Sequence, residues 1–170
     1  NGELYLQYHR GTLTSVAKNK ANNRNAERAK RELEFATSLA TMMKGSDYPR
    51  DAIRDLWDIV LINQFHDILP GTSIAAVYED CDAEYAQFFA AMQSEQGPMQ
   101  SALNAICPAK AGQLSLINFT GQGRDGELVE FNSDADLTGM GVGTDSGSTA
   151  LQSITRADGR AGMIAPRGER

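Results

Sequence analysis

Apolar residues recur at three- and four-residue intervals through three successive segments of this chain, and glycine or proline separates each segment from the next. This spacing gathers apolar side chains on one face of a helix, which must be buried against another element. We expect helices over residues 21–44, from Pro49 to before Pro70, and from after Gly71 to a break at Gly97-Pro98. A further helical stretch is expected at residues 99–106. The short connections favour an antiparallel three-helix bundle.

The predicted boundaries carry residues that helix ends prefer. Gly45 suits the end of the first helix, and Pro49 suits the first turn of the second. Thr72 or Ser73 is the expected N-cap of the third. The predicted inward-facing residues are Ala29, Leu33, Ala36, Ala40 and Met43, with Phe35 and Leu39 widening the stripe; Ile53, Leu56, Trp57, Val60 and Leu61; and Ile74, Val77, Tyr78, Cys81, Tyr85, Phe88 and Met92.

The character of the chain changes after Pro108. Alternating and β-branched residues predict short strands at residues 113–118, 127–131 and 151–157. Residues 136–150 are poor in apolar side chains, so we expect this segment to be mobile. The predicted fold class is therefore mainly α, a three-helix antiparallel bundle followed by a truncated β-rich segment. The domains would be residues 1–107 and residues 108–170, the latter beginning a β-sandwich that is partly mobile.

Composition excludes several classes of protein. Hydrophobic residues at 41% and charged residues at 22% are typical of a soluble globular protein. A net charge of −6 argues against a nucleic-acid partner. The sequence also lacks an apolar run of the roughly 20 residues that a membrane-spanning helix needs. We interpret the basic residues between Lys18 and Arg31 as a solvated helix face, and Cys81 as a small core residue.

The second predicted helix leads into Asn-Gln-Phe-His-Asp-Ile-Leu-Pro-Gly, residues 63–71. A histidine beside a carboxylate, His66-Asp67, is a plausible half of a metal and sugar site. Neighbouring residues on a helix point about 100° apart, so the two side chains could address different targets. Zinc needs three or four protein ligands, which indicates a piece of a larger enzyme. The simpler alternatives are a helix-terminal histidine that interacts with the helix dipole, and an aspartate that is solvated or caps the turn.

Two separated motifs resemble glycoside hydrolase family 38, the metal-dependent α-mannosidases, with the bacterial and cytosolic-type members most similar. They are Gly-Glu-Leu-Tyr-Leu-Gln-Tyr-His-Arg-Gly-Thr-Leu-Thr-Ser at residues 2–15 and Leu-Ile-Asn-Gln-Phe-His-Asp-Ile-Leu-Pro-Gly-Thr at residues 61–72. The resemblance runs from residue 2 to about residue 131. It implies a three-helix middle domain in which His66 is one zinc ligand and Asp67 binds sugar hydroxyls. His9 would line the sugar subsite, where relatives carry an aromatic residue.

The resemblance assigns no catalytic nucleophile or acid/base carboxylate to this chain. We therefore expect a fragment of a retaining α-mannosidase that cleaves terminal α-mannosides with one zinc ion per site. The fragment alone would be inactive. Its expected partners are the α-mannoside oligosaccharide, the missing N-terminal catalytic domain and the remaining C-terminal β domains, with no nucleic acid or membrane. The expected location is the bacterial cytoplasm. The alternative function is a non-catalytic helical-bundle scaffold or interaction module.

Overall fold

The computed structural model describes residues 10–108, 117–120, 127–131, 141–144, 147–150, 152–155 and 161–165. The chain divides into two compact units, residues 1–117 and residues 118–170. The first unit contains the helices α1 (Ala17–Lys44), α2 (Arg50–Asn63), α3 (Ala75–Gln93) and α4 (Pro98–Ile106). The prediction of a mainly helical chain is confirmed.

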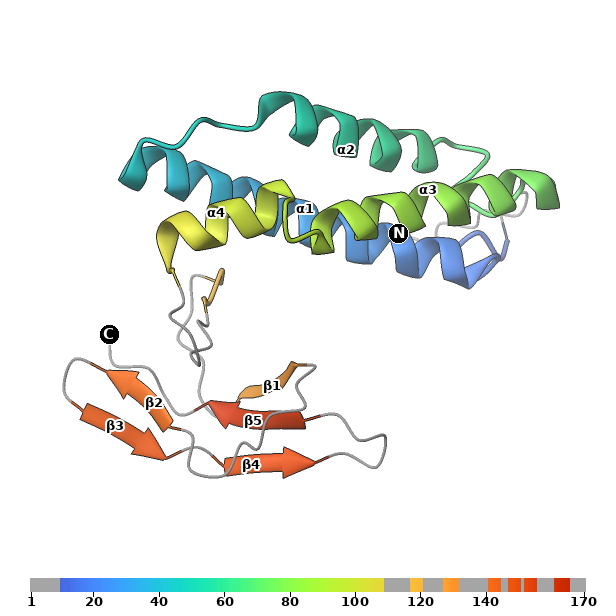
Figure 1. Ribbon diagram of the computed structural model, residues 1–170. Coiled ribbons are helices and arrows are strands. Elements are labelled where there is room, and N and C mark those ends of the chain that lie inside the picture. The colour runs from blue at the N-terminus through green and yellow to red at the C-terminus, as the bar shows by residue number, and fades with distance from the viewer. Residues whose placement is uncertain are drawn as a thin grey trace, which may run out of the picture. The chain divides into compact units, whose positions relative to one another are not determined.

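Helix α1 is the longest element and contacts each of the other three helices. As Figure 1 shows, α2 runs back along α1, and α3 and α4 then follow one another in the direction of α1. The third arm of the bundle is thus a broken rod. The break lies at Gly97, where a Cβ atom would come within 2.6 Å of the Ala91 carbonyl oxygen. Pro98 then begins α4, because the backbone N–H that proline lacks would have no hydrogen-bond partner within the helix at this position.

The core lies between α1, α2 and α3. Its buried cluster consists of Ala26, Leu33, Ile53, Leu56, Val60, Tyr85 and Phe88. Four residues predicted to face inward are exposed, namely Phe35, Met43, Leu61 and Ile74. Phe35 lies two residues, about 200°, from the buried Leu33, and Ile74 precedes the first turn of α3. On α2 the inward positions are Leu56, Val60 and then Asn63, which leaves Leu61 off the stripe.

The helix ends differ from the prediction in a way that shapes the next loop. Helix α2 stops at Asn63 rather than near Pro70, and α3 begins at Ala75 with Ile74 as its N-cap. The predicted caps Thr72 and Ser73 do not cap α3. Their hydroxyls donate instead to the Asp67 carbonyl, at 3.2 Å and 2.5 Å. Residues 64–74 therefore form a turn-rich connection, here called the α2–α3 loop.

The interpretation of the basic residues of α1 as a solvated face is wrong for Lys30, whose side chain is fully buried. Its Nζ donates to the Ile53 carbonyl at 2.8 Å and lies 4.9 Å from the centre of the Trp57 ring. Glu34 Oε1 lies 3.8 Å from this ammonium and accepts a hydrogen bond from Trp57 Nε1 at 2.6 Å. This cluster joins α1 to α2. Because burial removes water from the ammonium, it lowers the pKa of Lys30.

The second unit contains the short strands β1 (Glu127–Phe131), β2 (Gly141–Thr144), β3 (Gly147–Ala150), β4 (Gln152–Thr155) and β5 (Ala161–Ala165). One sheet has the order β1-β5-β4 and the other pairs β2 with β3, all antiparallel. Strands β2 and β3 fall in the segment predicted to be mobile because it is poor in apolar residues. Strands can form there because an antiparallel ladder satisfies the backbone groups through main-chain hydrogen bonds, which need no apolar side chains.

The strand predicted at residues 127–131 is present, and β4 lies within that predicted at residues 151–157. Of the strand predicted at residues 113–118, residues 113–116 lie outside the described residues, and residues 117–118 are not in a strand. The β-sandwich and the boundary at residue 107 stay predictions. Among the helices of the described part, none combines the length and hydropathy of a membrane span.

Replacing Lys30 by methionine tests the buried ammonium. The unfolded chain holds its Lys30 proton up to about pH 10.5, whereas the folded chain releases it at lower pH. The free energy of unfolding of the wild-type chain should therefore increase as the pH rises from the lowered pKa of Lys30 in the folded chain to about 10.5. Lys30→Met should lack this increase and be at least as stable as the wild type at pH 7, because an apolar side chain carries no desolvation cost.

Urea unfolding between pH 7 and pH 10.5 measures the difference between the two chains. Lys44→Met, in the exposed last turn of α1, controls for the loss of one positive charge. Identical pH profiles for Lys30→Met and the wild type would contradict the assigned cost of burial.

Candidate functional site

His66 and Asp67 lie on the surface of the α2–α3 loop. Their side chains are 76% and 65% exposed, and His66 Nε2 lies 3.5 Å from Asp67 Oδ2. The Phe65 ring packs against the imidazole with 4.2 Å between ring centres. The predicted 100° divergence of the two side chains is wrong, because the helix ends at Asn63 before it reaches them. The pair instead presents one joined polar group.

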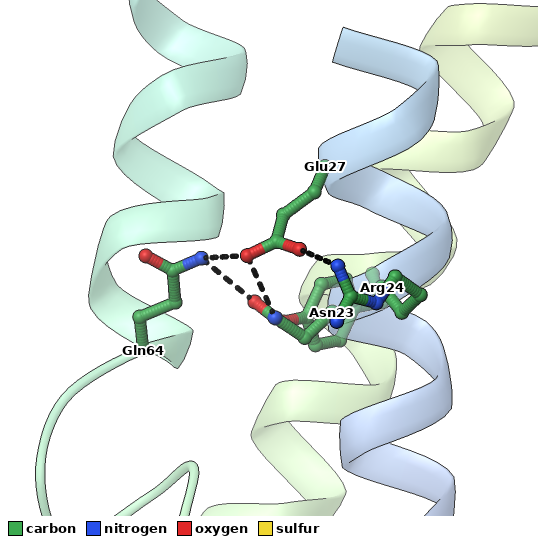
Figure 2. A network of polar contacts seen from close by, with 5 residues as sticks. Asn23, Arg24, Glu27 and Gln64 are labelled. Atoms are coloured by element: carbon green, nitrogen blue, oxygen red, sulfur yellow. Dashed lines mark hydrogen bonds and ion pairs between the residues drawn. The ribbon is translucent and has the colours of Figure 1, made fainter. Parts of the chain in front are cut away.

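Two polar residues at the end of α2, Gln64 and Asn63, face inward and anchor the loop. Gln64 Nε2 donates to Asn23 Oδ1 and to Glu27 Oε1 on α1, each at 3.0 Å. Asn23 Nδ2 and Arg24 also donate to the Glu27 carboxylate, at 3.2 Å and 3.3 Å, as Figure 2 shows. The end of α2 is thus tied to α1 by a charge-assisted network.

Asn63 ties the same helix end to α3. Its side chain is fully buried, and its Nδ2 donates to Glu84 Oε2 at 2.6 Å and to the Ile59 carbonyl at 2.9 Å. Sequence reasoning missed Asn63 and Gln64 as anchors. The available signal was position, since Asn63 continues the stripe through Leu56 and Val60.

The backbone of the loop is held by side chains of α1 and α3. The Ile68 carbonyl accepts hydrogen bonds from Tyr78 Oη at 3.1 Å, Asn19 Nδ2 at 3.4 Å and the Gly71 amide at 3.1 Å. The Leu69 carbonyl accepts from Lys20 Nζ at 2.9 Å. Two successive carbonyls directly after Asp67 are therefore bound from outside the loop.

Gly71 lets the loop lie directly on the turn that precedes α1. It has φ +91°, and a Cβ atom there would lie 2.7 Å from Ser15 Cβ and 2.9 Å from the Ser15 carbonyl oxygen. Only glycine combines this backbone conformation with so close an approach. The Pro70-Gly71 sequence thus fixes the loop against α1.

The residues of the pair fit one part of a metal site. A neutral imidazole offers one nitrogen lone pair, and zinc ligands commonly have a carboxylate beside the other ring nitrogen. Among the described residues, no group of three or more His, Cys, Asp or Glu side chains could hold a metal ion. The exposed apolar side chains Leu61, Ile62, Phe65 and Ile74 flank the pair along the chain.

The remaining predicted residues divide into two groups. His9 lies outside the described residues, so its place in a sugar subsite stays a prediction. Cys81 is buried, as predicted, and burial raises the pKa of its thiol.

A cavity of about 360 Å³ lies at the other end of the bundle, between the end of α1, the start of α2 and the α3–α4 junction. The pair does not line it.

Residues 7–105 match the family model described as the alpha mannosidase middle domain. The chain is 34% identical to "Alpha-mannosidase 2C1" of Mus musculus over 118 residues, which are 68% of this chain and 11% of that protein. The Homo sapiens protein of the same name gives the same identity and coverage.

A third relative is "Alpha-mannosidase" of Saccharomyces cerevisiae, 41% identical over 81 residues, 46% of this chain and 8% of that protein. This chain therefore spans about a tenth of the length of the curated relatives it matches. The family match covers more than half of the chain and includes the helical bundle and the α2–α3 loop. This chain belongs to the alpha mannosidase middle domain family, and the predicted membership of glycoside hydrolase family 38 is confirmed.

Proposed function

We propose that this chain is the middle domain of a zinc-dependent retaining α-mannosidase, in which His66 is one metal ligand and Asp67 contacts sugar hydroxyls. One observation carries the proposal, namely the exposed His66-Asp67 pair on a loop whose backbone is fixed from both sides. Its relatives are named alpha-mannosidases. The cytoplasmic and bacterial assignments stay predictions.

The position of His66 favours a ligand over a helix-dipole contact. A helix dipole acts on charges within the last turn, and His66 lies beyond the end of α2 at Asn63. Its imidazole is largely exposed, and Asp67 lies 3.5 Å from Nε2, which suits a ligand whose ring a carboxylate orients. Zinc, when bound, supplies a Lewis acid and a template for sugar hydroxyls.

The contacts of Asp67 favour a substrate role over a cap. The turn is closed by Thr72 and Ser73 hydroxyls that donate to the Asp67 backbone carbonyl. Its carboxylate is 65% exposed and faces His66. A carboxylate accepts two hydrogen bonds at once, which matches the adjacent hydroxyls of a sugar. Charged hydrogen bonds of this kind contribute on the order of 1.5–3 kcal/mol each.

The rest of the active site would come from other domains of the same protein. One imidazole with one carboxylate is too few ligands for zinc, and retaining hydrolysis needs two further carboxylates. In that reaction one carboxylate attacks the anomeric carbon, while the other protonates the leaving oxygen and then activates water. We propose that a preceding catalytic domain supplies these groups and that further β domains follow this chain. The substrate would be a terminal α-mannoside.

The alternative, a helical scaffold or interaction module, gains support from the exposed apolar side chains near the loop. It gives no role to an exposed histidine and aspartate on an anchored backbone. The mannosidase proposal accounts for both features, because the apolar side chains can pack against the domain that completes the site.

The isolated chain should neither bind zinc tightly nor hydrolyse an α-mannoside, because one imidazole and its neighbouring carboxylate are an incomplete site. Calorimetric titration with zinc and incubation with a chromogenic α-mannoside measure the two properties. A stoichiometric tight site that His66→Ala removes would show that this chain contains the other ligands. Turnover that disappears in the same variant would contradict the assignment of the catalytic carboxylates to another domain.

In the whole enzyme, His66→Ala should lower both zinc content and kcat/KM. Asp67→Asn should keep the zinc while kcat/KM falls about ten- to a hundred-fold, from losing charged contacts worth roughly 1.5–3 kcal/mol. Metal analysis and steady-state kinetics separate the two variants. Asp58→Asn, an exposed aspartate on α2, is the matched control and should retain full activity. If Asp67→Asn has normal kcat/KM and normal zinc, Asp67 does not contact the sugar.

A further inference from the structure

We propose that Lys20 is a positioning residue, which holds the α2–α3 loop so that His66 and Asp67 are fixed for metal and substrate. This inference rests on the proposed function of the pair. The ammonium of Lys20 joins two segments that are far apart in sequence. Its Nζ donates to the Leu69 carbonyl at 2.9 Å and also to the Ser15 carbonyl. One charged donor therefore ties the loop to the turn before α1.

The position of Lys20 in the first turn of α1 does not stabilise the helix itself. The first turn of α1 contains Lys18 and Lys20 and no acidic residue. Positive charge near a helix N-terminus is unfavourable, because the macrodipole is positive there. A lysine at this position thus needs another stabilising interaction, and two backbone carbonyls provide it.

The turn that Lys20 holds is itself in a constrained conformation. Val16 has φ 48°, in the left-handed region that β-branched residues rarely adopt. The Lys20 ammonium binds the carbonyl of the preceding residue, Ser15, against which Gly71 packs. Lys20 therefore fixes both surfaces where the loop meets α1.

Neighbouring contacts explain how the hydrogen bonds of Lys20 help to position His66 and Asp67. Tyr78 and Asn19 bind the Ile68 carbonyl, and Lys20 binds the next one along, that of Leu69. These carbonyls follow Asp67 directly in the chain. A ligand pair on a loop is precise only when its backbone is held by a supporting shell. Among the residues that the structure describes, Lys20 supplies the one cationic contact to these two carbonyls.

Lys18 offers a matched control two residues away on the same helix. Its Nζ pairs with Asp82 on α3 at 2.6 Å, and both side chains are substantially exposed. Exposed ion pairs of this kind contribute little to stability. Lys18→Met therefore removes the same charge from the same helical turn without touching the loop.

Amide hydrogen exchange of this chain tests the positioning directly. In Lys20→Met, the amides of Ile68, Leu69 and Gly71, which donate within the loop, should exchange about tenfold faster or more, because local opening becomes easier. Core amides of α1 should keep their protection. Lys20→Arg should retain slow exchange, and Lys18→Met should match the wild type. Lys20→Gln serves as a second variant if Lys20→Met does not fold. Unchanged loop exchange in a folded variant overturns the inference.

Zinc affinity of the whole enzyme, measured by competition with a chelator, links the positioning to the site. Lys20→Met should raise the zinc dissociation constant about tenfold, the size typical when a residue that orients a ligand is lost, and Lys20→Arg should restore it. His66→Ala is the reference. If His66→Ala leaves zinc affinity unchanged, the proposed function fails. If His66→Ala removes zinc and Lys20→Met binds it normally, the inference about Lys20 alone is wrong.

Discussion

The geometry of the α2–α3 loop depends on the buried amide of Asn63. Its position continues the inward stripe of α2, so the side chain cannot reach water. Burying amide N–H groups without acceptors costs free energy, and Glu84 on α3 and the Ile59 carbonyl accept hydrogen bonds from Asn63 Nδ2. Gln64 makes the equivalent contacts with α1. These bonds fix where α2 ends, and the following residues then turn outward.

The bundle thus combines two kinds of interface along α1. Its middle presents Ala26 and Leu33 to the apolar core, whereas its first turns present Asn19, Lys20 and Asn23 to the loop and to α2. Apolar packing tolerates small shifts, but a hydrogen bond has a narrow range of distance and angle. Polar anchors therefore suit the end of the bundle that must hold the His66-Asp67 pair.

Periodicity predicted the helical bundle and most of its core, because burial repeats at helical intervals. It placed Leu61 inside, since apolar character alone cannot separate Leu61 from the adjacent stripe position. It also extended α2 beyond Asn63, because residues 64–69 contain nothing that forbids a helix. The motif singled out His66 and Asp67, whose roles stay predictions. Lys20, Asn63 and Gln64 were not predictable as anchors, because the value of a polar residue that faces inward depends on which acceptors a distant helix supplies.

A site divided between domains, as proposed above, would have a physical consequence for the whole protein. When an ion is held jointly by His66 and by ligands of another domain, neither part alone binds it tightly, so binding free energy also favours docking of the two domains. At a metal concentration of a hundred times the dissociation constant, this linkage contributes about 2.7 kcal/mol. That contribution depends on His66 being in place before the domains meet. A loop fixed by Lys20, Asn63 and Gln64 has lost its conformational freedom during folding of the bundle, and docking need not order it again.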